Sequence, residues 1–335
     1  MTTTTTLKDW FRNTSDSENK KIMLLDGGVS THLRDLCGQH PKGHPLRADW
    51  YPELWSSSLL MTPDGRETIL KGHQDWLAAG TQILTTVTYQ CGMVNAIVKD
   101  ETTATQMLAD GVQLARQATQ HNGKEEDKFV VASMGCYGAA LADGSEYTGH
   151  YPNIQSEQEL QDFHRRKTLT LLQQKPDGIA LETVPCVMEC RAFIQLMQEL
   201  QQQDNNDKNC ACWISFACRN GHELNDGSKL EEALQAIQEL DPEATIIHAI
   251  GVNCCDSQHI LSLVQIIADF LVSTARRGVI IYPNSGEEWD GQTKEWKQGT
   301  GYVTMKMCLQ NGSWKRWRLL NVLGRTAATT IHHLE

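Results

Sequence analysis

The sequence lacks the long apolar run that a membrane-spanning helix requires, because none of its stretches approaches about 20 consecutive apolar residues. Its N-terminus, Met1 followed by a run of threonines, lacks the basic and apolar regions of a signal peptide. The net charge of −11 provides no overall basic surface for nucleic acid or anionic lipid. We therefore expect a cytoplasmic protein that has neither a nucleic-acid partner nor a membrane partner.

The chain also lacks a Cys-x-x-Cys pair, although it contains 11 cysteines. Without a secretory signal, cysteines in a chain of this length indicate reduced thiols rather than a disulfide framework, and no zinc finger is visible. Only 9 of the 335 residues are proline, which suits a large α/β domain. We expect residues 1–15 to form a flexible tail and residues 16–335 to form one domain.

Apolar runs that resemble buried strands alternate with helical patterns along the chain. Several runs show little polar alternation, as expected for parallel strands covered on both faces. Seven such strands with helices between them predict a (β/α)8 TIM barrel whose eighth strand is disrupted or still to be found. A doubly wound open sheet is the alternative, but no Gly-rich dinucleotide-binding turn follows any strand. The strands are predicted at 22–25, 82–89, 129–133, 178–181, 211–216, 246–252 and 279–282.

Two helices carry clear start signals. Ser156 and Glu159 have the spacing of a capping box, and so do Ser228 and Glu231. After the second pair, apolar residues recur on one helical face up to Leu240. Both segments are therefore predicted to be helices that cover the sheet.

The run Gly251-Val-Asn-Cys-Cys255 closes one of the predicted strands and places two thiols at the edge of the sheet. Thiolates suit Zn²⁺, which binds cysteine sulfur at about 2.3 Å and acts as a Lewis acid when a coordination position stays open. Free cysteines are also often buried for packing alone, so these residues by themselves leave both interpretations open. Cys255 is the weaker candidate, because its side chain is expected to point away from the edge if strand geometry persists.

Other strand ends carry polar residues that the same edge of a parallel barrel brings together. Asp26-Gly27-Gly28 follows the first strand, and Glu182 ends the fourth. Taken singly, the first is a turn signal and the second a residue next to a helix start. Together with Cys254 they predict a polar pocket with two carboxylates and a soft metal ligand, which suits an amino acid that carries a thiol.

These motifs resemble the homocysteine S-methyltransferase family over nearly the whole chain. The sequence is most similar to members that use S-methylmethionine or S-adenosylmethionine, rather than betaine, as the methyl donor. The motifs that carry the resemblance are Asp26-Gly-Gly-Val-Ser-Thr-His-Leu33, Thr88-Tyr-Gln90, Tyr137-Gly-Ala-Ala-Leu-Ala-Asp-Gly-Ser-Glu-Tyr-Thr-Gly149, Glu182-Thr-Val-Pro185, Trp213-Ile-Ser-Phe216, Gly251-Val-Asn-Cys254 and Tyr282-Pro-Asn-Ser-Gly-Glu287.

The resemblance implies a (β/α)8 barrel and zinc-dependent transfer of a methyl group to homocysteine, giving methionine. It also implies that the residues holding homocysteine are Asp26, Gly27, Gly28, Glu182 and Asn253, and that Cys254 is a zinc ligand and catalytic residue. Zinc removes the proton from a thiol near neutral pH and leaves the sulfur nucleophilic. Family members bind zinc through two further cysteines in a later Gly-Gly-Cys-Cys-Arg-Thr motif.

That second motif is missing from this chain, which reads Ser-Trp-Lys-Arg-Trp-Arg-Leu-Leu-Asn-Val-Leu over residues 313–323. One interpretation is a true loss of two zinc ligands, with a divergent strand at 319–323. Another is a shifted reading frame, since tryptophan has the single codon TGG and reading one nucleotide later gives glycine at Trp314 and Trp317. That frame permits Ala-Gly-Ser-Val-Gly-Gly-Cys but fails one codon later, so a second frame change or a splice junction near Leu320 is also required. Cys308 lies on a predicted helix too early in the chain to replace the missing pair.

Three functions therefore stay open. The first is the zinc-dependent methyltransferase, and the second is a non-catalytic relative that keeps an amino-acid pocket without the metal. The third is a barrel hydrolase or lyase with Asp26 and Glu182 as an acid–base pair. For the first, the partners are homocysteine and a sulfonium donor, and the resemblance points to Tyr89, Gln90 and the loop 282–287 around the donor. We expect a monomer or a small homo-oligomer.

Overall fold

The computed structural model describes residues 5–13, 23–40, 46, 51, 54–92, 97–121, 128–203, 209–274 and 277–284, and the strand segments 289–290, 295–296 and 322–324. Strands and helices alternate, so that each of α4 and α6–α9 lies in sequence between two consecutive strands. The helices are α1 (Leu7–Asn13), α2 (Val29–Gly38), α3 (Pro63–Ala78), α4 (Glu101–His121), α5 (Tyr137–Leu141), α6 (Glu157–Gln173), α7 (Val187–Gln202), α8 (Leu230–Leu240) and α9 (Ile260–Val272). The strands are β1 (Met23–Leu25), β2 (Ile83–Thr85), β3 (Phe129–Gly135), β4 (Gly178–Val184), β5 (Ala211–Phe216), β6 (Ala249–Asn253), β7 (Gly278–Tyr282), β8 (Trp289–Asp290), β9 (Glu295–Trp296) and β10 (Val322–Gly324).

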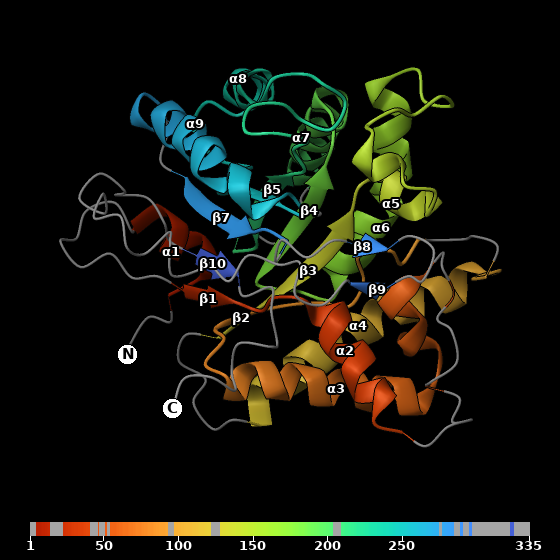
Figure 1. Cartoon of the computed structure of the whole chain (residues 1–335). Coiled ribbons are helices and arrows are strands. Elements are labelled where there is room, and N and C mark those ends of the chain that lie inside the picture. Colours follow the sequence, from red (N-terminus) through yellow and green to blue (C-terminus); the bar gives the residue numbers. More distant parts are fainter. Residues whose placement is uncertain are drawn as a thin grey trace.

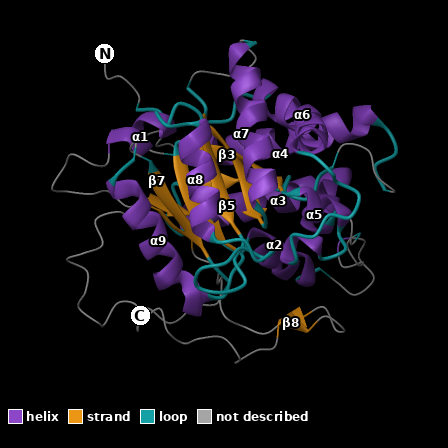
Figure 2. Ribbon diagram, turned by 90° about the horizontal axis from the view of Figure 1, so that it is seen from above, coloured by secondary structure: helices purple, strands orange, loops and turns teal. Residues whose placement is uncertain are grey.

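Strands β1–β7 run parallel and form one curved sheet with helices around it (Figure 1). Neighbouring strands in this sheet are also neighbours in the sequence, so the strand order never reverses. A doubly wound sheet requires such a reversal, so that alternative is wrong. Figure 2 shows the strands enclosed by helices, and the predicted α/β fold with buried parallel strands is confirmed.

Two short pairings complete the sheet contacts. β10 pairs in parallel with β1, where Met23 lies opposite Val322, and with β7, where Ile280 lies opposite Val322. β8 and β9 form a separate antiparallel pair. The segment 319–323, proposed above as a divergent strand, overlaps β10 at residues 322 and 323, and residues 319–321 lie outside the described residues.

Two predicted strand boundaries were wrong for local reasons. β2 ends at Thr85 rather than continuing to residue 89, because the hydroxyls of Thr86 and Thr88 bond each other at 2.6 Å and Thr88 donates to Ser133 O at 2.7 Å. β6 begins at Ala249 rather than at residue 246. Before it, the Asp241 carboxylate accepts backbone N–H groups of a turn, including that of residue 247 at 2.8 Å.

The first of the two predicted capping boxes is confirmed and the second is not. Ser156 accepts from the Glu159 N–H at 3.3 Å, and the Glu159 carboxylate accepts from the Ser156 N–H at 3.1 Å. The Ser228 hydroxyl donates instead to Asp226 at 2.6 Å, so α8 begins later, at Leu230. The Asp226 carboxylate thus accepts the hydroxyl that the sequence pattern assigned to the start of the helix.

Helix α1 closes the end of the sheet where the strands begin. Leu7, Trp10 and Phe11 share one helical face and are buried in a cluster with the first residues of several strands. Phe11 packs edge-to-face on Trp213 with ring centroids 6.4 Å apart. The expectation of a flexible tail over residues 1–15 is therefore wrong for residues 7–13, because apolar spacing of i, i+3 and i+4 gives this short helix a face to bury.

The backbone of β7 lies close to Gly251 of β6. A Cβ at this position would lie 1.9 Å from the carbonyl oxygen of Ile280, which belongs to a fixed strand backbone. We expect Gly251→Ala to lower the free energy of unfolding by about 3 kcal/mol, the upper part of the range for overpacked cores. Gly38→Ala is the matched control, since nothing lies within 4 Å of its added Cβ. Urea unfolding of both variants measures the effect, and equal stabilities would contradict the strand packing described here.

Candidate functional site

The first component of the site is Asp26, which follows β1 and is buried at 2% exposure. Its carboxylate accepts from the N–H of Thr85 at 2.7 Å and from the Thr85 hydroxyl at 2.9 Å, so the end of β2 fixes its orientation. Burial raises the pKa of Asp26 well above its usual range, and the nearby Glu182 raises it further. The two hydrogen bonds from Thr85 act in the opposite direction and lower this pKa. Gly27 and Gly28 then lead into the N-terminus of α2.

Glu182 lies near the end of β4 and is buried at 7% exposure. Its Oε1 atom has no hydrogen-bond partner among the described residues. Burial raises the pKa of Glu182 to about 7, although hydrogen bonding to Ser133 and Tyr282 and the positive charge of Lys167 lower it. A buried carboxylate with an unused oxygen is able to bind a cationic or hydrogen-bond-donating ligand.

Asn253 joins the ends of β4 and β6. Its Oδ1 accepts from the Thr183 N–H at 2.8 Å, while its Nδ2 donates to the Thr183 hydroxyl at 2.9 Å and to the Cys254 sulfur at 3.2 Å. Thr183 and Cys254 both have left-handed backbone conformations, with φ of 62° and 50°. Such strain costs about 1–3 kcal/mol per residue and gathers at functional sites, where the surroundings hold it in place. Both polar atoms of the Asn253 amide are bonded to Thr183 or Cys254. A contact between Asn253 and substrate stays a prediction.

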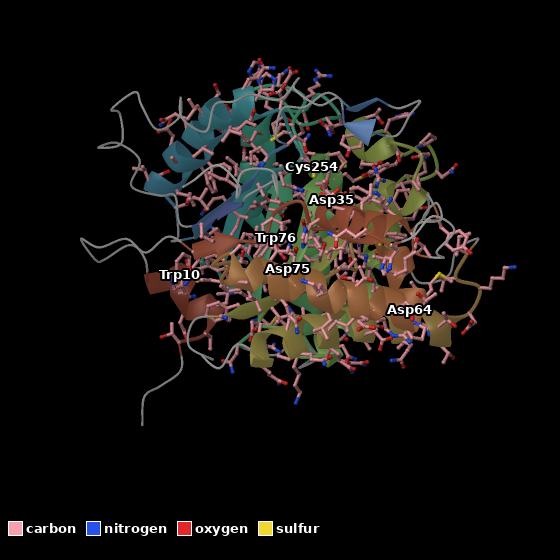
Figure 3. The ribbon with its side chains drawn as sticks, turned by 60° about the horizontal axis from the view of Figure 1, so that its bottom comes forward. Trp10, Asp35, Asp64, Asp75, Trp76 and Cys254 are labelled. Carbon is pink, nitrogen blue, oxygen red and sulfur yellow. The ribbon has the colours of Figure 1, made fainter. Side chains whose placement is uncertain are left out.

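The two adjacent thiols have different environments. Cys254 follows β6 at the edge of the sheet and is half-buried, whereas Cys255 is 3% exposed and packs in the hydrophobic core. β6 ends at Asn253, so strand geometry does not continue to Cys255, and the direction expected for its side chain stays a prediction. Burial raises the pKa of the Cys254 thiol to about 11, against a hydrogen bond from Thr183, and the charge of Glu182 raises it further. Figure 3 marks Cys254 and also Trp10, which lies on the helix at the opposite end of the strands.

Zinc does not fit the donor set of the described residues. No group of three or more His, Cys, Asp or Glu side chains in that part of the chain is able to hold a metal ion. Cys254 is the one half-buried thiol among the described cysteines, because the others, including Cys136, Cys186 and Cys218 after neighbouring strands, are buried. Cys308 and residues 313–321 lie outside the described residues.

A buried lysine beneath the site was not found from the sequence. Lys167 of α6 is 6% exposed, and its ammonium donates to the carbonyl oxygens of Thr88 and Tyr89 at 2.8 and 2.9 Å. Burial lowers the pKa of Lys167 to about 8, against the charges of Cys91 and Glu182. Helical spacing could have revealed this buried lysine from the sequence. Lys167 lies three residues after His164 and four before Leu171, on the buried face of α6.

A second unpredicted group positions the loop that follows β3. The Glu189 carboxylate accepts from the Tyr137 N–H at 2.6 Å, from the Tyr151 hydroxyl at 2.8 Å and lies 2.7 Å from His164 Nε2. Both members of the His164–Glu189 pair have fully buried side chains. The network fixes the start of α5 and therefore the direction of the loop 142–149 at the edge of the sheet.

The residues expected around a second substrate are only partly described. Gln90 is buried and donates to Ala139 O at 3.2 Å, and the Tyr282 hydroxyl lies 2.6 Å from Ser215 Oγ. Tyr89 is half-buried, and its backbone carbonyl is held by Lys167. Residues 285–287 of the predicted 282–287 loop lie outside the described residues.

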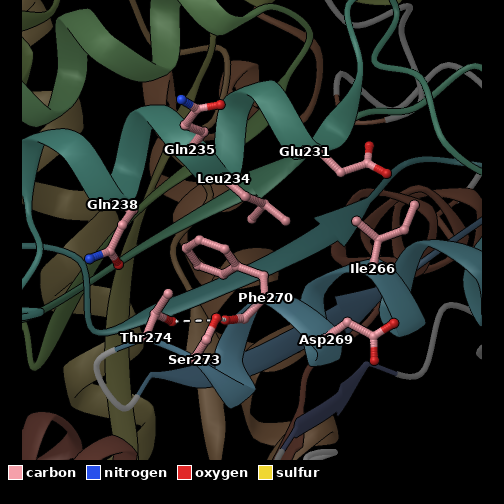
Figure 4. A pocket seen from close by; sticks show the side chains of 9 residues that line it. All are labelled: Glu231, Leu234, Gln235, Gln238, Ile266, Asp269, Phe270, Ser273 and Thr274. Carbon is pink, nitrogen blue, oxygen red and sulfur yellow. Dashed lines mark hydrogen bonds between the residues drawn. The ribbon is translucent and has the colours of Figure 1, made fainter.

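A separate shallow groove lies between α8 and α9 and shares no residue with this site (Figure 4). Phe270 lies in it, and its carbonyl accepts from the Ser273 and Thr274 hydroxyls at 3.3 and 3.1 Å. The groove is lined by Glu231, Leu234, Gln235, Gln238, Ile266, Asp269, Phe270, Ser273 and Thr274.

In the part of the chain that is described, no helix is long and apolar enough to cross a membrane.

The raised pKa of Glu182 predicts a pH dependence of stability. The folded protein holds this proton with a pKa of about 7, compared with an ordinary value of 4.5. The stabilising contribution is therefore complete below pH 4.5 and is lost as the pH rises through about 7, by about 3 kcal/mol at most. Glu182→Gln removes the titration, so its stability relative to the natural chain is expected to rise over this interval. Urea unfolding at several pH values measures the difference, with Glu239→Gln, at an exposed position, as the control. A difference that stays constant with pH would contradict the burial of this carboxylate.

Comparison with known proteins identifies the family to which this chain is similar. Residues 23–335 match the family model described as homocysteine S-methyltransferase. The chain is 34% identical over 286 residues to homocysteine S-methyltransferase 1 of Arabidopsis thaliana, which covers 82% of this chain and 79% of the relative. It is 32% identical over 284 residues to a homocysteine S-methyltransferase of Bacillus subtilis, covering 82% and 81% of the two chains.

A solved structure shows the same fold. The homocysteine methyltransferase MmuM from Escherichia coli, in its metallated form, superposes with a TM-score of 0.66 at 30% sequence identity. The match covers 83% of this chain and 88% of the E. coli chain. The family model spans most of the sequence, and both relatives exceed 30% identity, so the chain belongs to the homocysteine S-methyltransferase family.

Proposed function

We propose that this enzyme transfers a methyl group from a sulfonium donor to the sulfur of homocysteine and so produces methionine. The observation that carries the proposal is the pair of buried carboxylates, Asp26 and Glu182, at the same edge of the sheet as the Cys254 thiol. The family assignment displaces the hydrolase or lyase alternative for these carboxylates. In this proposal they bind substrate rather than exchange protons with it.

We propose that the amino-acid end of homocysteine lies between β1 and β4. Its ammonium faces Glu182 and Asp26, because a buried cation requires charged partners. Its carboxylate faces Gly27 and Gly28 at the N-terminus of α2, where helix N–H groups and the helix dipole favour an anion. The thiol of homocysteine then extends towards Cys254 and Asn253.

The chemical step is a displacement at carbon. The homocysteine sulfur, as its thiolate, forms a bond to the donor's methyl carbon while the bond between that carbon and the sulfonium sulfur breaks. The bonding electron pair goes to the donor sulfur, which becomes a neutral thioether. Opposite charges on acceptor and donor disappear together, and a site that excludes water favours this neutralisation.

We propose a complete (β/α)8 barrel for the domain, with β10 as its eighth strand. The support is the position of β10, which pairs in parallel with both β7 and β1 and so occupies the gap between the last and first strands. In the family, the missing zinc motif follows the eighth strand. In a chain that carries the motif, its two cysteines would therefore follow β10.

We propose zinc dependence for a chain that carries the family's Gly-Gly-Cys-Cys motif, and weak zinc binding for this chain as written. Zinc sites require three or four protein ligands, and affinity collapses as thiolates are removed. When bound, zinc supplies a means of keeping the acceptor sulfur deprotonated. A second candidate function, amino-acid binding without methyl transfer, is favoured because the described residues contain no group of three side chains able to hold a metal ion.

Homocysteine binding tests the pocket. We expect Glu182→Ala to weaken homocysteine affinity by about 2–4 kcal/mol, the cost of removing one partner of a buried charge-assisted pair. Glu239→Ala, at a surface ion pair, is the control and is expected to bind normally. Isothermal titration calorimetry measures both. An unchanged affinity in Glu182→Ala would place homocysteine elsewhere.

Zinc content and methyl transfer test the rest of the proposal. The natural chain is compared with a variant in which Gly-Gly-Cys-Cys is inserted directly before Arg325, so that β10 is kept. We expect about one zinc per chain after dialysis in the variant and far less in the natural chain, with Cys254→Ser removing the metal from the variant. We expect kcat/KM in the variant to be larger for S-methylmethionine than for S-adenosylmethionine, because the sequence shows no separate nucleotide-binding turn. Stoichiometric zinc in the natural chain would show that the ligands lie elsewhere, and a preference for S-adenosylmethionine would reverse the choice of donor.

A further inference from the structure

The short helical turn Ser145–Tyr147, in the loop after β3, holds a third buried carboxylate, that of Glu146. The backbone carbonyl of Glu146 accepts from the Asn225 side chain at 2.9 Å, which links this turn to the loop after β5. The Ser145 N–H donates to Asp143 Oδ1 at 2.9 Å. On the other side, a Cβ at Gly138 would lie 2.3 Å from the Glu146 nitrogen, so α5 packs directly on the turn. The backbone of Glu146 is thus held from three directions.

The Glu146 side chain is buried but has no counter-charge. It is 9% exposed, and its Oε2 atom has no hydrogen-bond partner among the described residues. No lysine, arginine or histidine in that part of the chain forms an ion pair with it. Burial raises the pKa of Glu146, and the neighbouring Asp143 raises it further. An isolated buried carboxylate is destabilising, so its retention on a fixed turn indicates a cationic ligand.

The loop that carries Glu146 lies at the same edge of the sheet as Glu182 and Cys254. In this loop a Cβ at Gly149 would lie 2.9 Å from the carbonyl oxygen of Pro185, which directly follows β4. The charge of Glu146 also contributes to the raised pKa of the Cys254 thiol. Glu182 ends β4, whereas Glu146 belongs to the loop after β3. In the proposed function, Glu182 and Asp26 hold the ammonium of homocysteine. Glu146 is therefore left for the second substrate, whose methyl carbon must approach the acceptor sulfur to about 3–3.5 Å.

We propose that the Glu146 carboxylate recognises the sulfonium cation of the methyl donor. This assignment rests on the proposed function, and it adds the residue that distinguishes a charged donor from its neutral product. Once the methyl group has moved, the donor sulfur is an uncharged thioether and the electrostatic attraction to Glu146 disappears. The same carboxylate thus favours binding of the donor and release of the spent donor.

The effect of Glu146 falls on affinity rather than on the rate of the chemical step. Positive charge on the donor decreases as the transition state forms, so the carboxylate stabilises the bound donor more than the transition state. Loss of the carboxylate is therefore expected to raise the KM of the donor while kcat stays the same or increases. A group that merely supports the fold would lower kcat and weaken both substrates together.

Two ligands that differ in a single methyl group and one charge provide the test. S-methylmethionine carries the sulfonium, and methionine has the same amino-acid end with a neutral sulfur. Calorimetric titration of the full natural chain gives the ratio of the two affinities without requiring turnover. In Glu146→Gln we expect S-methylmethionine to bind at least about tenfold more weakly, with methionine affinity unchanged within about twofold.

Asp143→Asn is the matched control, because it removes the same charge from the same loop at an exposed position. We expect this variant to keep the natural ratio, and thermal unfolding of both variants verifies that they fold. An unchanged ratio in Glu146→Gln, or an equal loss for both ligands, would overturn the assignment. If the natural chain binds homocysteine in a manner that depends on Glu182 but does not bind S-methylmethionine, the assignment of Glu146 is overturned. The homocysteine pocket stays intact in that case. Failure to bind homocysteine at all would instead remove the proposed function on which the assignment rests.

Discussion

The desolvation of Glu182 at the end of β4 is the constraint on which the site depends. The strand backbone carries this carboxylate to a buried position, where Oε1 has no partner among the described residues and burial raises its pKa to about 7. The positive charge of Lys167 offsets part of the desolvation cost of Glu182. The Lys167 ammonium also donates hydrogen bonds to the carbonyl groups of Thr88 and Tyr89. A ligand that brings a positive charge to this position would satisfy the carboxylate, so the energetic cost in the free enzyme becomes affinity for substrate.

Three hydrogen-bonded groups hold the strand ends in a fixed relation to that carboxylate. Asn253 connects Thr183 to Cys254 and stabilises the left-handed backbone of both residues. Thr85 fixes Asp26, and Glu189 with His164 fixes the start of α5. Each group joins elements that are far apart in the sequence. The edge of the sheet is therefore positioned before substrate binds, which lowers the ordering cost of binding.

The distribution of thiols separates binding from catalysis in this chain. Cys254 lies beside the carboxylates, but Cys255 is part of the core, and the described residues contain no three-ligand group. Recognition of an amino acid requires the carboxylates and the N-terminus of α2, whereas activation of the acceptor sulfur by zinc requires ligands beyond Cys254. Binding of the amino acid and binding of zinc thus depend on largely different residues.

The sequence by itself determined the alternation of strands and helices, the parallel sheet and the polar strand ends at Asp26, Glu182 and Cys254, because local apolar patterns and motif order carry that information. It did not determine that α1 covers the end of the sheet, since a seven-residue helix has little local signal and gains its stability from packing on Trp213. It also did not determine the role of Lys167 or the burial of Glu146. Charged residues look like surface residues in a sequence, and only tertiary structure decides which of them lose water and which partners they then lack.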